Sequence, residues 1–77
     1  MREAVDDPCY WLDVREAVCH AIDALEAKGY DTERDTPCDE DLLEATEIGI
    51  RKAGIKQITP ERLTLYLLEE LEDIRIA

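Results

Sequence analysis

The chain has 77 residues, and 20 acidic side chains against 9 basic ones give it a formal net charge of −11. This is the length of one small domain, and such an acidic excess disfavours direct binding to nucleic acid or to an anionic membrane, because contact with phosphates requires a basic surface. Hydrophobic residues make up 45% of the chain, too large a share for a disordered tail, so we expect residues 1–77 to form one folded domain that favours basic partners.

The first predicted helix spans residues 8–28. Asp7 and Pro8 form a start signal, since an acid can cap a helix and proline suits its first position. Apolar residues then recur at steps of three and four: Trp11, Val14, Val18, Ile22 and Leu25. This spacing is typical of an amphipathic helix with one buried face, and Gly29 is expected to end it.

The second predicted helix spans residues 37–53 and repeats the start signal at Thr36 and Pro37. Acidic residues follow in its first turn, where the helix dipole favours them. Its inner stripe contains Leu42, Thr46, Ile50 and Ala53. Gly49 lowers helix propensity, and we interpret it as the point where two helices cross closely. Gly54 is expected to end this helix.

The third predicted helix spans residues 60–75 and follows a short connector whose Ile55 and Ile58 are expected to plug the core. Thr59 can cap this helix, and Pro60 suits its first position. Its inner stripe contains Leu63, Leu67, Leu71 and Ile74. Three amphipathic helices joined by short loops predict an all-α fold, a compact three-helix bundle with roughly antiparallel neighbours.

The third helix also carries apolar residues off its inner stripe. At about 100° per residue, Leu65 and Ile76 point nearly opposite to that stripe. Acidic residues lie beside them, at the helix end where the dipole favours cations. These features predict a partner-binding surface made of Leu65, Tyr66, Leu68, Glu69, Glu72, Asp73 and Ile76, with Leu65 and Leu68 as anchors. The alternative is that single exposed leucines serve no partner at all.

The cysteines and the histidine form a weaker candidate for chemistry, a metal site made of Cys9, Cys19, His20 and Cys38. Structural zinc sites usually use close pairs of ligands, whereas the spacings here are ten, one and eighteen residues. The alternatives are free thiols in a reducing compartment or one disulfide from Cys38 to Cys9 or Cys19. We expect no cofactor and no catalytic residues, because the sequence shows no nucleophile paired with a base.

Residues Gly49–Leu71, with the connector Gly54-Ile55-Lys56-Gln57-Ile58-Thr59-Pro60-Glu61, locally resemble the second-loop region of histone-fold proteins. In that family a basic loop and a short Ile-Thr step precede the last helix. The family's long central helix is missing, because Pro37 limits the preceding helix, and the acidic balance does not suit wrapping of DNA. No function is therefore inferred from this resemblance.

The sequence favours a non-enzymatic interaction module that self-associates or docks a basic or apolar partner through its last helix. Two alternatives stay open: an inhibitor that mimics the charge of DNA, and a small Cys/His metal or redox module. Residues 1–30, 31–58 and 59–77 carry net charges of −4, −4 and −3, so no single segment concentrates the charge.

Location is predicted from what the sequence lacks. Residues 1–7 are acidic and contain no apolar signal core, and no apolar run approaches the roughly 20 residues of a membrane span. We therefore expect a cytoplasmic protein. The chain contains no asparagine and one glutamine, a bias typical of thermophilic proteins.

Overall fold

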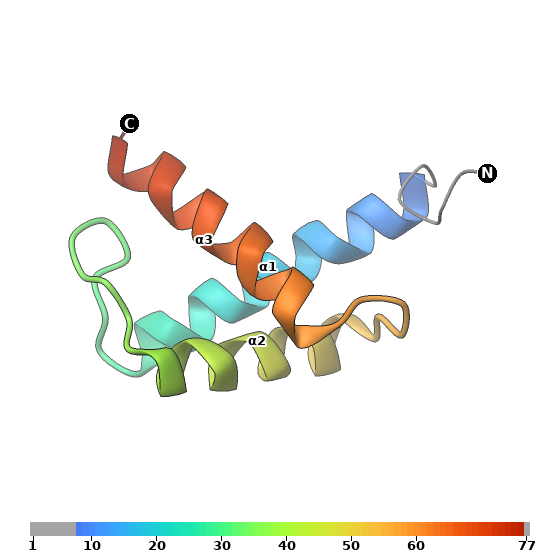
Figure 1. The fold of residues 1–77 in the computed structure, drawn as a ribbon, viewed down its shortest axis with the longest axis horizontal. Coiled ribbons are helices and arrows are strands. Elements are labelled where there is room, and N and C mark those ends of the chain that lie inside the picture. Colours follow the sequence, from blue (N-terminus) through green and yellow to red (C-terminus); the bar gives the residue numbers. More distant parts are fainter. Residues whose placement is uncertain (1–7, 77) are drawn as a thin grey trace.

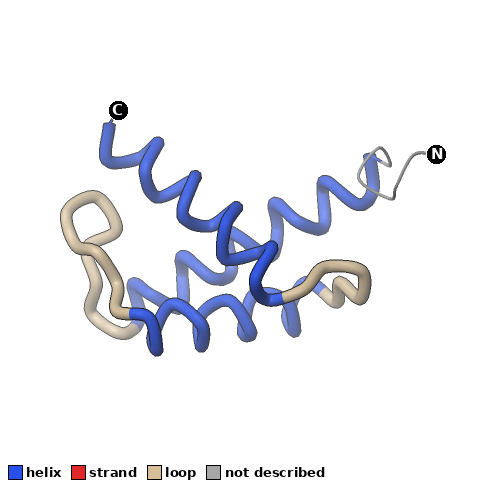
Figure 2. The backbone as a smooth tube through the Cα atoms, viewed as in Figure 1, coloured by secondary structure: helices blue, strands red, loops and turns tan. Residues whose placement is uncertain are grey.

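The computed structural model describes the backbone of residues 8–76 and the side chains of residues 12–75. This part of the chain forms three helices and no strand: α1 (Pro8–Ala27), α2 (Asp39–Ala53) and α3 (Pro60–Ile76). Figures 1 and 2 show α1 and α3 crossing in an X, with α2 running beneath both. The prediction of an all-α three-helix bundle is confirmed. The side chains of Cys9, Trp11 and Ile76 lie outside the described part.

The inner stripes of the three helices meet in one core. Its largest fully buried side chains are Val14 and Leu25 of α1, Thr46 of α2, and Leu63 and Leu67 of α3. The connector residues Ile55 and Ile58 are buried beside them, so the prediction that they plug the core is confirmed. Each fully buried valine or leucine contributes about 1.5–3 kcal/mol relative to an exposed one.

The closest helix contact joins α1 and α2, which share the most extensive interface in the bundle. A Cβ atom placed on Gly49 would overlap the backbone carbonyl oxygen of Ala17 and lie 3.3 Å from the Cβ of Ala21. Ala17, Ala21 and Ala45 are completely buried. Small residues on both helices therefore let the two backbones approach closely, and the prediction of a helix crossing at Gly49 is confirmed.

Two glycines end their helices in different ways. After α1, the N–H of Gly29 donates to the Glu26 carbonyl and the N–H of Tyr30 donates to the Leu25 carbonyl, at 3.0 and 3.2 Å, which is a Schellman motif. After α2, the N–H of Gly54 donates to Ile50 at 2.9 Å in a single αL closure. Both glycines have positive φ, +103° and +73°, a conformation that other residues rarely adopt.

The start of α2 differs from the prediction. The helix begins at Asp39, two residues after Pro37, and its N-cap residue Cys38 makes no side-chain capping bond. The Thr36 hydroxyl is engaged elsewhere, since it accepts a hydrogen bond of 3.3 Å from the Arg75 guanidinium of α3. At the start of α3 the prediction holds, because the hydroxyl of Thr59 accepts a hydrogen bond of 3.2 Å from the Arg62 N–H.

The helix contact at Gly49 leads to a first prediction. We expect Gly49→Ala to lower the free energy of unfolding by at least about 1 kcal/mol, because the added methyl group meets backbone that cannot rotate away. Helix propensity alone predicts the opposite, a gain of about 1 kcal/mol. Urea unfolding followed by circular dichroism measures the difference.

The control for this prediction is Glu47→Ala, at an exposed position of the same helix, which we expect to change stability by less than about 0.5 kcal/mol. If Gly49→Ala is as stable as the parent chain, α1 and α2 can lie further apart at this crossing than they do in the structure.

Candidate partner-binding groove

The predicted partner-binding residues divide between two faces of α3. Leu65 and Leu68 are 62% and 40% exposed, and with Glu72 they lie on the outer side of the helix, opposite the buried Leu63 stripe. Tyr66, Glu69 and Asp73 instead line a groove between α3 and α1. The strip that the sequence predicts as one surface is therefore two surfaces, and Ile76 lies outside the described side chains.

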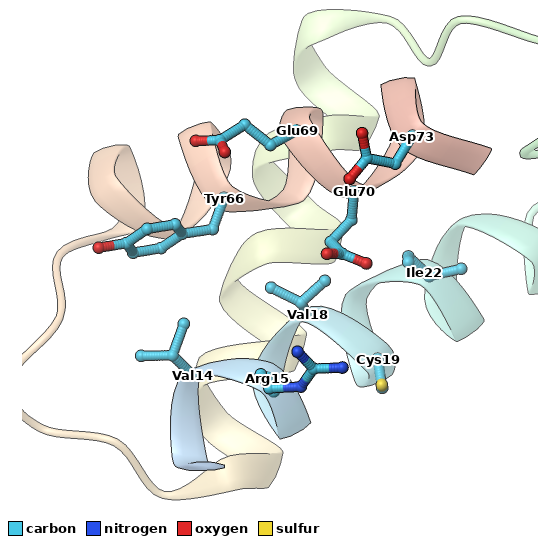
Figure 3. A pocket seen from close by; sticks show the side chains of 9 residues that line it. All are labelled: Val14, Arg15, Val18, Cys19, Ile22, Tyr66, Glu69, Glu70 and Asp73. Carbon is cyan, nitrogen blue, oxygen red and sulfur yellow. The ribbon is translucent and has the colours of Figure 1, made fainter. Parts of the chain in front are cut away.

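The groove has a volume of about 450 Å³. Its lining residues are Val14, Arg15, Val18, Cys19 and Ile22 from α1, and Tyr66, Glu69, Glu70 and Asp73 from α3. Figure 3 shows the two helices as its walls, with the apolar side chains of α1 along one wall and the carboxylates along the other. We call this feature the α1/α3 groove.

Helical spacing explains why these residues gather. Val14, Val18 and Ile22 follow one another at four-residue steps, so they form a continuous apolar line along α1. Val14 and Val18 are buried, while Ile22 is half-buried. Tyr66 packs against the core from the α3 side. The floor of the groove is thus the edge of the hydrophobic core, left partly open where α1 and α3 cross.

The groove is acidic. Its lining includes three carboxylates, of Glu69, Glu70 and Asp73, and one guanidinium, that of Arg15. In Figure 3 the side chain of Glu70 extends toward α1, whereas that of Glu69 points away from it. Among the ion pairs of the described residues, none joins Arg15 to these carboxylates. Among the described side chains that line the groove, carboxylates therefore outnumber cations three to one.

Sequence reasoning did not assign Arg15 or Glu70 to the site. A signal for Glu70 was available, because Tyr66, Glu70 and Asp73 stand at positions i, i+4 and i+7 and so share one side of α3. No signal in the sequence identifies Arg15, since its place in the groove depends on how α3 crosses α1.

The cysteines and the histidine are dispersed over the described structure. Cys19 and Cys38 are free and exposed thiols, so no disulfide joins them. Cys19 lies in the groove, while the Nε2 atom of His20 lies 3.7 Å from a Glu16 carboxylate oxygen on the surface of α1. Within the described side chains, no three His, Cys, Asp or Glu residues are grouped to hold a metal ion.

Cys38 belongs to a separate polar cluster at the junction of α1 and α2. The Tyr30 hydroxyl donates a hydrogen bond of 2.6 Å to the Asp41 carboxylate, accepts one of 3.4 Å from the Cys38 N–H, and lies 3.6 Å from the Cys38 sulfur. The Lys28 ammonium lies 2.9 Å from Glu44 and 3.5 Å from Asp41. This cluster ties the residues that follow α1 to the first turns of α2.

Hydrogen bonding shifts the acidity of this cluster. The bond to Asp41 is the main cause that raises the pKa of Tyr30 to about 12. The same bond lowers the pKa of the Asp41 carboxyl, and a hydrogen bond to Glu44 is the largest cause that raises the pKa of Lys28. Because the donors and acceptors of this cluster bond to one another, we assign it a structural role in holding the loop between α1 and α2.

The chain was compared with models of protein families, with curated protein sequences and with solved structures, and nothing matches it. A function for this chain has therefore to be inferred from the groove itself. Among the described helices, none combines the length and the apolar character needed to cross a lipid bilayer.

The Tyr30–Asp41 hydrogen bond leads to a second prediction. An unfolded tyrosine ionises near pH 10 and the folded Tyr30 near pH 12, so the stability gained from its neutral form is complete below pH 10 and is lost as pH rises toward 12. The lowered pKa of the Asp41 carboxyl affects stability at low pH. The stabilisation that it gives the folded state is present above the usual carboxyl pKa and is lost as pH falls through the pKa of the folded state.

We therefore expect Tyr30→Phe to be less stable than the parent chain at pH 7, with the difference shrinking between pH 10 and pH 12. Urea unfolding at a series of pH values measures it. Asp41→Asn, which keeps the shape of the acceptor but removes its charge, should show a loss of the same sign. A difference that stays constant from pH 10 to 12 would contradict the assignment.

Proposed function

We propose that this chain is a non-enzymatic protein-interaction module that binds a basic partner in the α1/α3 groove. The observation that carries the proposal is a groove in which the half-buried Ile22 and Tyr66 lie beside three carboxylates and a single guanidinium. An apolar floor supplies binding energy when it is covered, and the charged rim selects the sign of the partner and accelerates its approach.

The position of the carboxylates on α3 supports this proposal. Glu69 and Asp73 are four residues apart, a spacing at which like charges destabilise a helix by about 0.2–0.5 kcal/mol. They also lie in the last turns of α3, where the helix dipole disfavours negative charge. A cationic partner in the groove would relieve both effects, so the arrangement costs the free protein a little stability and favours a bound state.

The net charge argues for a basic partner over a second copy. Each copy carries −11, so two acidic grooves or an acidic groove and an acidic surface would repel each other unless counter-ions intervened. An inhibitor that mimics DNA needs acidic groups without an apolar floor between them, and here Val18 and Ile22 lie beside the carboxylates. The groove therefore suits a basic segment of a protein better than it suits the phosphate-binding surface of a nucleic-acid-binding protein.

The test compares two variants that change the net charge equally. We expect Glu69→Gln/Asp73→Asn to weaken binding of a short synthetic peptide rich in leucine and lysine by about 2- to 30-fold, because each exposed ion pair contributes about 0.2–1 kcal/mol. The matched control, Glu47→Gln/Glu72→Gln, removes two exposed carboxylates that do not line the groove and should weaken binding much less. Fluorescence anisotropy at low salt measures both affinities.

A third variant tests whether the partner binds to the outer face of α3 instead of the groove. Leu65→Lys/Leu68→Lys removes the two exposed leucines of α3 and adds two positive charges. Its affinity for the basic peptide should lie within about twofold of that of a control variant that carries two lysines at other exposed positions. Loss of binding in this variant, with no effect of the groove variant, would place the partner on the outer face and overturn the assignment to the groove.

A further inference from the structure

We infer that the segment bound in the α1/α3 groove is an amphipathic α-helix of the basic partner, which lies along the groove as a fourth helix of the bundle. This inference rests on the function proposed above and adds the conformation and the charge pattern of the partner. Its grounds are the length of the groove, the elements that form its walls and the placement of its charges.

The length of the groove matches two turns of helix. At 1.5 Å per residue, the line from Val14 to Ile22 extends about 12 Å, and the opposite wall from Tyr66 to Asp73 extends about 10 Å. A helix that presents apolar residues at positions i, i+4 and i+7 places its first and last anchors about 10 Å apart. Such a helix would span the groove and cover Ile22 and Tyr66, the half-buried apolar side chains of its two walls.

The walls of the groove favour a helix over other bound conformations. A partner strand needs an exposed sheet edge to pair with, and the described part of the chain contains no strand. A polyproline segment needs a row of aromatic rings, and Tyr66 is the one aromatic residue that lines the groove. A helix satisfies its own backbone hydrogen bonds, so it needs only side-chain contacts of the kind that this groove offers.

The charges in the groove are unequal on its two sides. Carboxylates lie along α3, with Glu69 and Asp73 four residues apart, whereas the guanidinium of Arg15 lies on the α1 side. A bound helix is therefore expected to carry Lys or Arg at positions i and i+4 on the flank that faces α3. Its other flank, which faces Arg15, should be neutral or acidic. With the apolar face turned into the groove, this pattern selects the direction in which the helix runs.

Other occupants fit the charges less well. Residues 1–7 of the chain, which precede α1, carry one arginine and three acids, so their sign is wrong for a carboxylate rim. A second copy of the chain brings a net charge of −11. A basic helix from another protein complements the rim, and we commit to it as the occupant.

The two free thiols of the described side chains provide the readout. Cys19 lines the groove, while Cys38 lies beside Tyr30 and outside it, and both are exposed. A helix seated in the groove should slow alkylation of Cys19 and leave Cys38 unaffected. Mass spectrometry of proteolytic fragments reports the two rates separately in the same sample, so Cys38 is an internal control for changes in reagent or folding.

Three synthetic peptides of about 14 residues, four helical turns, serve as probes. The first is a Leu/Lys/Ala helix with leucines at i, i+4 and i+7, and lysines on one flank and glutamates on the other. The second has the same sequence with one central residue replaced by proline, which breaks the helix but preserves the charge. The third distributes the same lysines and glutamates evenly over both flanks, so that neither direction of the bound helix turns all lysines toward α3, and composition is preserved.

We expect the first peptide to slow alkylation of Cys19 at least about fivefold at saturation, and the proline peptide to bind at least about tenfold more weakly. We expect the mixed-flank peptide to bind several-fold more weakly than the first, because in either direction it places lysines beside Arg15 and glutamates beside the carboxylates of α3. Glu69→Gln/Asp73→Asn should reduce the difference between the first and third peptides, whereas Glu47→Gln/Glu72→Gln should preserve it.

The outcomes separate this inference from the proposed function. Equal protection of Cys19 by the first and the proline peptides would overturn the helical conformation and leave a basic partner in the groove. Equal protection by the first and the mixed-flank peptides would overturn the charge pattern. No protection by any peptide, together with equal binding to both charge-matched variants, would overturn the groove as a binding site. A dimer of the chain that loses Cys19 reactivity would assign the groove to a second copy.

Discussion

The contact of Gly49 with the Ala17 backbone is the constraint on which the rest of the bundle depends. Because this position has no side chain, α1 and α2 approach more closely than larger residues would allow. Their interface is completed by alanines that are fully buried. Little space for large side chains remains between these two helices, so the leucines of α3 supply much of the buried volume. The helix pair is thus a platform that α3 covers.

The groove follows from the way α3 covers this platform. Two helices that cross at an angle separate on either side of the crossing, and α1 and α3 do so in Figure 1. Leu63 and Leu67 of α3 are fully buried in the core. Further along α3, the space beside α1 stays open and is lined by Tyr66 and by carboxylates.

Two polar links limit how far α3 can move over the pair. The hydroxyls of Thr46 and Thr64 lie 3.2 Å apart and join α2 to α3 near the centre of the bundle. The Arg75 guanidinium reaches the Thr36 hydroxyl in the loop after α1. Neither link closes the groove, which lies on the α1 side of α3. The arrangement therefore holds α3 in place while leaving the proposed binding surface accessible.

The sequence by itself determined the three helices, most of their ends and the buried stripes, because these depend on residues within a few positions of one another. Proline and glycine act locally through the backbone, and an apolar stripe depends only on the helical period. The start of α2 escaped sequence reasoning because the hydroxyl of Thr36 bonds to Arg75, far along the chain. Only the tertiary structure decided which side of α3 faces α1. The crossing of these helices divides the predicted partner strip in two and brings Arg15 and Glu70 into one groove, because packing over the whole core sets the crossing.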